Sequence, residues 1–63
     1  MNTTFHFSSD DSRAFFRFVA LIEHCTEHAF SWHKDILGFH IEVCNTDESI
    51  LPSNMVGLVT ITH

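Results

Sequence analysis

The sequence predicts a small α+β fold: a single domain in the order β-α-β-β, with one helix packed on one face of a small sheet. The chain has 63 residues, which is the size of one domain. Hydrophobic residues alternate in three segments and follow a helical period in a fourth. Hydrophobic residues make up 44% of the chain, with only 2 glycines and 1 proline, and this composition is typical of a folded protein. We therefore treat residues 1–63 as one domain.

The first strand is predicted over Thr3–Ser8, where Phe5 and Phe7 alternate with polar side chains. Several N-cap residues follow, so the helix is predicted over Asp11–His28. At about 100° per residue, one stripe of this helix is apolar and should face the core. That stripe consists of Ala14, Phe15, Phe18, Val19, Ile22, Cys25 and Ala29.

The second half of the chain predicts the remaining strands. Residues 30–33 fit either an extra short strand or a loop, whereas Phe39–Val43 alternates cleanly. The last strand is expected within Met55–His63, which is rich in β-branched residues. If the helix joins two neighbouring parallel strands, the crossover should be right-handed. The sheet face away from the helix would carry Thr4, His6, His40, Glu42, Thr60 and Thr62.

The charge of the chain argues against binding to nucleic acid. The formal net charge is −5, and only Arg13, Arg17 and Lys34 are basic, too few to neutralise many phosphates. An acidic chain is better suited to basic protein surfaces, including surfaces that normally hold nucleic acid. We expect no direct contact with nucleic acid.

The location expected for the chain is the cytoplasm. No basic segment followed by an apolar core is seen at the N-terminus, and no apolar run approaches the length of a membrane span. Cys25 and Cys44 are too few for a disulfide scaffold, so we expect reduced thiols, although a bridge between them is an alternative.

The segment His24-Cys25-Thr26-Glu27-His28 matches H-x-x-E-H, the signature of the inverted zinc proteases. On a helix, His24 and His28 would share a face and could bind a metal, with Glu27 as a general base. The resemblance covers five residues, and a catalytic zinc needs a third protein ligand. We expect no enzyme and no cofactor, with His24 and His28 as an alternative metal site.

Exposed hydrophobic residues predict a contact surface for another protein. On the helical wheel Phe16 falls outside the core stripe, beside Glu23 and Glu27. Other apolar residues exceed what one helix and one sheet face can bury, namely Trp32, Ile36, Leu37, Met55 and Leu58, and Leu51 lies in an apolar loop. We therefore predict that Phe16, Glu23, Glu27, Trp32 and Leu51 bind a partner; the alternative for Phe16 is cover by the chain's own loop at residues 50–52.

These observations favour a small acidic, non-catalytic protein-binding module. It would be an inhibitor or adaptor of the kind that phages and mobile elements carry, blocking a larger host protein, nuclease or defence complex through an apolar and basic surface. Small sheets expose unpaired edges, so a homodimer is also expected.

The sequence leaves two other functions open. The β-α-β-β layout, with a Trp just after the helix, is similar to the dodecins, and this resemblance implies an oligomeric flavin-binding protein with Trp32 as the stacking residue. The other is a metal-binding protein that uses His and Cys side chains, with His24 and His28 or with His6, His40 and His63 meeting on the open sheet face.

Overall fold

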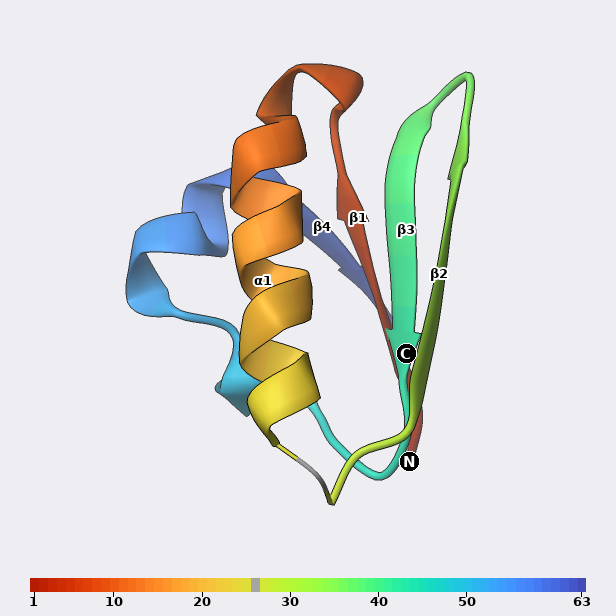
Figure 1. Ribbon diagram of the computed structural model, residues 1–63, viewed down its shortest axis with the longest axis vertical. Coiled ribbons are helices and arrows are strands. Elements are labelled where there is room, and N and C mark those ends of the chain that lie inside the picture. The colour runs from red at the N-terminus through yellow and green to blue at the C-terminus, as the bar shows by residue number, and fades with distance from the viewer. Residues whose placement is uncertain (26) are drawn as a thin grey trace.

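The computed structural model describes residues 1–25 and 27–63 and shows one helix packed against one face of a four-stranded antiparallel sheet (Figure 1). Three short 3-10 segments lie in the connections. The strands are β1 (Thr3–Phe7), β2 (Phe30–Asp35), β3 (Gly38–Val43) and β4 (Val59–Thr62), and the helix is α1 (Ser12–His24). The 3-10 segments are η1 (Ser9–Asp11), η2 (Glu48–Ile50) and η3 (Ser53–Leu58). The predicted α+β fold class is thus confirmed.

The strand order is β2-β3-β1-β4, which places β1 in the interior and β2 at an edge. β1 pairs antiparallel with both β3 and β4, and β3 pairs antiparallel with β2. β1 and β2 therefore run in the same direction with β3 between them. The helix joins two parallel strands that are not neighbours, so the simple crossover considered from the sequence does not apply.

The core lies between the sheet and α1 and is rich in phenylalanine. Phe5 of β1 meets Phe18 of α1 edge to face, with ring centroids 4.9 Å apart, and Phe7 meets Phe15 in the same way at 5.4 Å. Four residues of the predicted helical stripe are buried, namely Phe15, Phe18, Val19 and Ile22. Edge-to-face contacts add to the free energy gained by burying these large rings.

The helix ends at His24, four residues earlier than the hydrophobic pattern predicts. Cys25 has φ −92° and ψ 82°, and its N–H donates to the carbonyl oxygen of Ile22. A helix of 13 residues is about 20 Å long, which matches the length of a six-residue strand. The chain must then turn back to begin β2, so Cys25 is exposed and is not a core residue.

The other boundaries also differ in part from the prediction. The ambiguous residues after the helix form β2, which runs from Phe30 to Asp35 because it pairs with the whole of β3. Residues 55–58, predicted as the start of the last strand, belong instead to η3, and only Val59–Thr62 pair with β1. η2 and η3 lie along the flank of α1 that faces away from β2, whereas η1 lies at the N-terminal end of α1 (Figure 1).

The sheet face away from α1 carries the residues that the alternation predicted. Thr4 lies opposite both Glu42 and Thr62, and His6 lies opposite both His40 and Thr60. Residues that face each other in an antiparallel ladder point to the same side of the sheet. This surface is called the open face below.

Candidate functional site

Two large aromatic side chains, Phe16 and Trp32, meet at the surface between α1 and β2. Their ring centroids are 5.4 Å apart in an edge-to-face contact, and they remain 47% and 43% exposed. Two buried rings support them from below: Phe15 contacts both Phe16 and Trp32, and Phe39 contacts Phe16 and stacks on Phe15. Phe16 and Trp32 are called the aromatic surface below.

The local structure explains why both rings lie here. Trp32 pairs with the buried Ile41, so its side chain points to the helix side of the sheet. β2 is the edge strand and α1 lies over the middle of the sheet, so the helix covers Trp32 only in part. Phe16 projects from the flank of α1 nearest to β2 and contacts Trp32 instead of the loop at residues 50–52.

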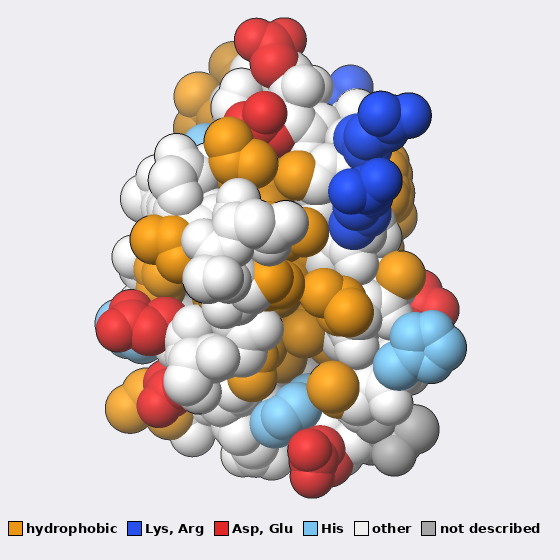
Figure 2. All heavy atoms as spheres, turned by 90° about the vertical axis from the view of Figure 1, so that its left-hand side faces the viewer, with side chains coloured by type: hydrophobic (Ala, Val, Ile, Leu, Met, Phe, Trp, Pro, Cys, Tyr) orange, Lys and Arg blue, Asp and Glu red, His pale blue; other side chains and the backbone are white. Residues whose placement is uncertain are grey.

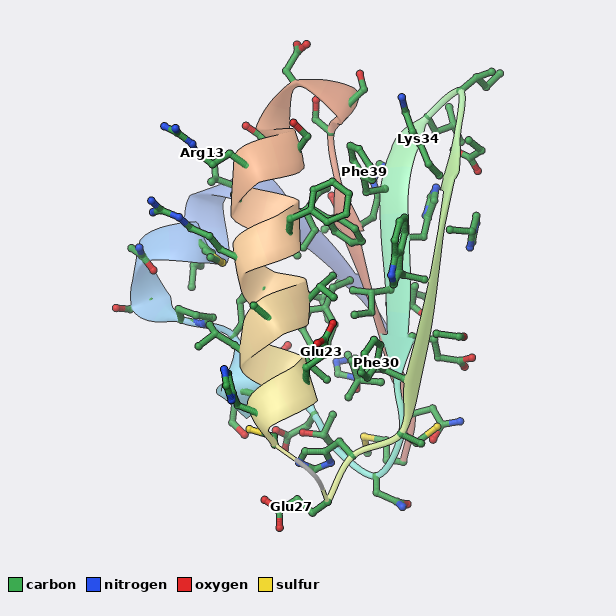
Figure 3. The ribbon with its side chains drawn as sticks, viewed as in Figure 1. Arg13, Glu23, Glu27, Phe30, Lys34 and Phe39 are labelled. Atoms are coloured by element: carbon green, nitrogen blue, oxygen red, sulfur yellow. The ribbon has the colours of Figure 1, made fainter. Side chains whose placement is uncertain are left out.

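Charged side chains border the aromatic surface. The Lys34 ammonium group lies 5.5 Å from the centre of the Phe39 ring, a cation–π contact. Glu23 projects from α1 on the side that faces the sheet, as does Phe30 from β2 toward the helix (Figure 3). Glu23 is exposed and lies seven residues after Phe16, on the same flank of the helix.

The structure does not bring all the predicted contact residues together. Leu51 is only 9% exposed and belongs to the core, so it is not accessible to a partner. Glu27 lies in the turn after α1, where it is 4.0 Å from the His28 ring, and no longer shares a helical face with Phe16. Of the five residues predicted to contact a partner, Phe16, Trp32 and Glu23 therefore remain as candidates.

A row of three histidines crosses the open face. His40 of β3 lies between His33 of β2 and His6 of β1, with ring centroids 4.7 Å and 4.4 Å away respectively. The rings are nearly parallel, with interplanar angles of 13° and 23°. His6 and His40 were expected to meet here, whereas His63 lies elsewhere, 3.5 Å from Glu48.

Asp35 at the end of β2 holds one side of this row. Its Oδ1 accepts hydrogen bonds from His40 Nε2 at 3.0 Å and from the Leu37 N–H at 2.8 Å, and its Oδ2 lies 3.9 Å from His33 Nε2. The hydrogen bond from His40, followed by that from Leu37, lowers the pKa of the Asp35 carboxyl below its usual value. His6 Nε2 donates to the Leu37 carbonyl oxygen at 3.0 Å.

Sequence reasoning missed His33 and Asp35 because β2 could not be told from a loop. Once Phe30–Asp35 is a strand, Ser31, His33 and Asp35 share one face by the two-residue period. Pairing then places His33 directly opposite His40. The alternation of Phe30, Trp32 and Lys34 with polar residues was the signal that could have found them.

The H-x-x-E-H segment does not form a two-histidine helical face. His24 is the last residue of α1, and His28 lies beyond it, where its Nδ1 donates to the Cys44 carbonyl oxygen at 3.0 Å. Thr26, in the middle of the segment, lies outside the described residues. Cys25 and Cys44 are both free thiols. Within residues 1–25 and 27–63, His33, Asp35 and His40 form the group that could hold a metal ion.

The other flank of α1 carries an apolar hollow of about 350 Å³. Hydrophobic side chains gather in the middle of this face of the molecule, and basic side chains lie along one border (Figure 2). The hollow is lined by Arg17, Ala20, Leu21, His24, Pro52, Asn54 and Met55. Leu21 is 46% exposed here, close to the exposure of Phe16 on the opposite flank, so Leu21→Ala can serve as a control for Phe16→Ala.

The architecture is therefore that of a small α+β domain which, besides the hollow beside α1, carries two surface features: the aromatic surface on the helix side of the sheet and the histidine row on the open face. No protein-family model, curated protein or solved structure matches the chain. Within the part of the chain that the structure describes, no helix has the length and hydropathy needed to span a membrane. The geometry of these two features is therefore the basis for inferring function.

Proposed function

We propose that this protein is a small, non-catalytic binding module that docks on a larger protein through the aromatic surface and the adjacent edge of β2. The observation that carries the proposal is the pairing of Phe16 and Trp32, two large rings in mutual contact that are both about half exposed. Tryptophan and other aromatic residues at the centre of an interface contribute most of its binding free energy.

The position of Trp32 on an edge strand supports this choice. β2 pairs with β3 on one side only, so the main-chain groups on its other side are open to a further strand. A partner segment that adds to β2 would gain main-chain hydrogen bonds, and its side chains on the helix side would contact Trp32 and Phe16. The expected partner segment is extended and carries apolar side chains.

The negative net charge of the chain favours a partner that is also basic. The net charge is −5, and Glu23 lies on the helix flank that carries Phe16. Complementary charge speeds association and disfavours acidic partners. An acidic chain of this size suits the role of an inhibitor, of the type carried by phages and mobile elements, that covers a basic site on a host protein such as a nuclease.

The test compares four versions of the full chain: wild type, Phe16→Ala, Trp32→Ala and the matched control Leu21→Ala. A partner is isolated from a host lysate with the wild-type chain, and its affinity for each version is measured by calorimetry. We expect Phe16→Ala and Trp32→Ala each to weaken binding by about 2 kcal/mol, or roughly 30-fold. Leu21→Ala should bind like the wild type.

Hydrogen exchange then locates the contact: the amides of β2 should exchange more slowly in the complex. Equal affinities for all four versions, or loss of binding in Leu21→Ala alone, would contradict the proposal. Light scattering of the free chain tests whether a second copy of the chain occupies this edge in place of a partner protein. A mass of twice 7.3 kDa that falls to the monomer value in Trp32→Ala would assign the surface to a homodimer instead.

The dodecin-like alternative is tested on the same material. Trp32 is the only tryptophan of the chain, so its fluorescence reports on the aromatic surface directly. Stacking of a flavin on Trp32 would quench this emission, whereas the protein-binding proposal predicts no quenching beyond absorption of light by the flavin.

A further inference from the structure

The geometry points to a binding site for a divalent transition-metal ion of the zinc type on the open face, with His33, Asp35 and His40 as its ligands. One ligand atom from each of the three residues lies within 4.8 Å of those of the other two. His40 Nε2 is 3.0 Å from Asp35 Oδ1, and His33 Nε2 is 3.9 Å from Asp35 Oδ2. The three side chains thus place their ligand atoms in one small region of the open face.

These separations suit tetrahedral coordination. Bonds of about 2.0–2.1 Å from zinc to nitrogen and oxygen place neighbouring ligand atoms about 3.3 Å apart. The separation of His40 Nε2 from Asp35 Oδ1, 3.0 Å, is close to that value, and His33 Nε2 lies farther away, 3.9 Å from the other carboxylate oxygen. His33 is 68% exposed at its side chain, so its ring can turn toward the ion without disturbing the core. Only small side-chain rotations are therefore needed to close the site.

The backbone of the β2–β3 hairpin holds the ligands in place before an ion arrives. His33 and Asp35 are two residues apart on β2 and share a face, and His33 lies directly opposite His40 on β3. Asp35 lies opposite Gly38 at the hairpin end, where the Leu37 N–H donates to its Oδ1 at 2.8 Å and holds the carboxylate beside His40. Binding would order few torsions, which limits its entropic cost.

The choice of ligands selects the class of ion. Imidazole nitrogens suit zinc, copper and nickel, whereas magnesium and calcium prefer an all-oxygen site. Two histidines and one carboxylate are the ligands of open zinc sites, in which water takes the fourth position. In the metal-free chain a proton on His40 Nε2 links it to Asp35, and the ion would take the place of that proton.

The neighbouring His6 supports the site without acting as a ligand. Its ring stacks on His40 at 4.4 Å, and its Nε2 donates to the Leu37 carbonyl oxygen at 3.0 Å. Both contacts fix the position of the His40 ring from the side opposite His33. Supporting groups of this kind orient metal ligands in proteins.

The site is independent of the aromatic surface. Trp32 and His33 are consecutive residues of β2, so their side chains point to opposite faces of the sheet. Trp32→Ala should therefore leave metal binding unchanged, and His33→Gln should leave binding to the protein partner unchanged. Failure of one proposal would not affect the other.

The experiment is a calorimetric titration of the untagged full chain with zinc chloride, repeated with magnesium and calcium. We expect one zinc per chain and no heat of binding from magnesium or calcium. His33→Gln and Asp35→Asn should each weaken zinc binding at least about tenfold, since even supporting groups around a metal contribute that much. The matched control His24→Gln, another exposed histidine, should bind zinc like the wild type.

Two further measurements test whether zinc binds the folded chain and whether it binds through histidine or through cysteine. Zinc should raise the melting temperature of the wild type but not that of His33→Gln, because an ion that binds only the folded state stabilises it. The variant carrying both Cys25→Ser and Cys44→Ser should still bind zinc. No binding at about 1 mM zinc, binding unaffected by His33→Gln and Asp35→Asn, or binding lost with the two cysteines would overturn the proposal.

Discussion

Asp35 and Gly38 lie opposite each other where β2 and β3 meet at their hairpin, and from this position Asp35 reaches His40, two residues further along β3. The carboxylate accepts hydrogen bonds from His40 Nε2 and from the Leu37 N–H. Gly38 itself has φ +127°, a conformation that residues with a side chain rarely adopt. The hairpin that carries Asp35 and His40 therefore needs glycine at this position because of its backbone conformation and its close main-chain neighbours.

We expect Gly38→Ala to destabilise the fold by about 2–3 kcal/mol. The φ of this position is strained for alanine, and the added Cβ would also meet main-chain atoms. These are the Phe7 carbonyl oxygen and, at 3.0 Å, the Ser9 nitrogen. Chemical denaturation measures the change. Gly57→Ala is the matched control, because a Cβ there meets nothing within 4 Å, and its effect should stay within about 0.5 kcal/mol. Equal effects of the two substitutions would contradict this account of Gly38.

Two neighbouring phenylalanines of α1 should differ sharply in their contribution to stability. Phe18 is fully buried against Phe5 and Phe7, so Phe18→Ala should cost about 3–5 kcal/mol. Phe16 is about half exposed, and Phe16→Ala should cost only about 1 kcal/mol while shifting the Trp32 emission to longer wavelength. Denaturation followed by fluorescence and circular dichroism measures both. A large loss of stability in Phe16→Ala would show that the aromatic surface serves mainly to hold the fold.

Thr3 is the buried polar residue of the core, and its hydroxyl donates to the Thr46 carbonyl oxygen at 2.8 Å. Thr3→Val keeps the shape of the side chain but leaves that carbonyl without its donor. We expect a loss of about 1–2 kcal/mol in the free energy of unfolding. Thr62→Val, at an exposed position of β4, is the control and should change stability by less than about 0.5 kcal/mol. A Thr3→Val chain as stable as the wild type would contradict the structural role of this hydrogen bond.

Asp47 caps η2, where its Oδ1 accepts from the Ser49 N–H at 2.9 Å. Hydrogen bonds from the Ser49 side chain and main chain lower the pKa of the Asp47 carboxyl below 3.8. A carboxyl whose pKa is lower in the folded state than in the unfolded state stabilises the fold when it is ionised. This stabilisation is complete above the unfolded-state pKa and is lost as the pH falls through the folded-state pKa.

The stability advantage of the wild type over Asp47→Asn should therefore shrink as the solution is acidified from pH 5 to about pH 2.5. Carbon-detected NMR titration of the Asp47 carboxyl tests the cause directly. A midpoint at or above 3.8 would contradict the hydrogen-bonded cap.

The sequence predicted the strands best where alternation was strongest. Phe5 and Phe7 marked β1, and Phe39, Ile41 and Val43 marked β3, because a half-buried strand must alternate apolar and polar side chains. The end of α1 was predicted four residues late, since apolar residues continue at a helical period beyond the point where the chain must turn. Local pattern carries no information about the length of sheet that a helix has to cover.

The candidate sites divide in the same way. Phe16 and Trp32 were predicted as contact residues because hydrophobic residues outside a core stripe are visible in a helical wheel and in composition, and Glu23 because it lies beside Phe16 on that wheel. Their role in binding stays a prediction. Leu51 was assigned to the surface because nothing local distinguishes an apolar residue in a core-covering loop from one in an exposed loop. His33 and Asp35 were missed because their face depends on β2 being a strand.

The sequence by itself determined that this chain forms one small α+β domain with an acidic surface and a core made largely of phenylalanine. Period and composition are local properties, and they are sufficient for that conclusion. Only the tertiary structure decided the strand order β2-β3-β1-β4, and with it the meeting of Phe16 with Trp32 and of His33 with His40. Those pairs lie on different elements, and long-range strand pairing and helix packing set the distances between them.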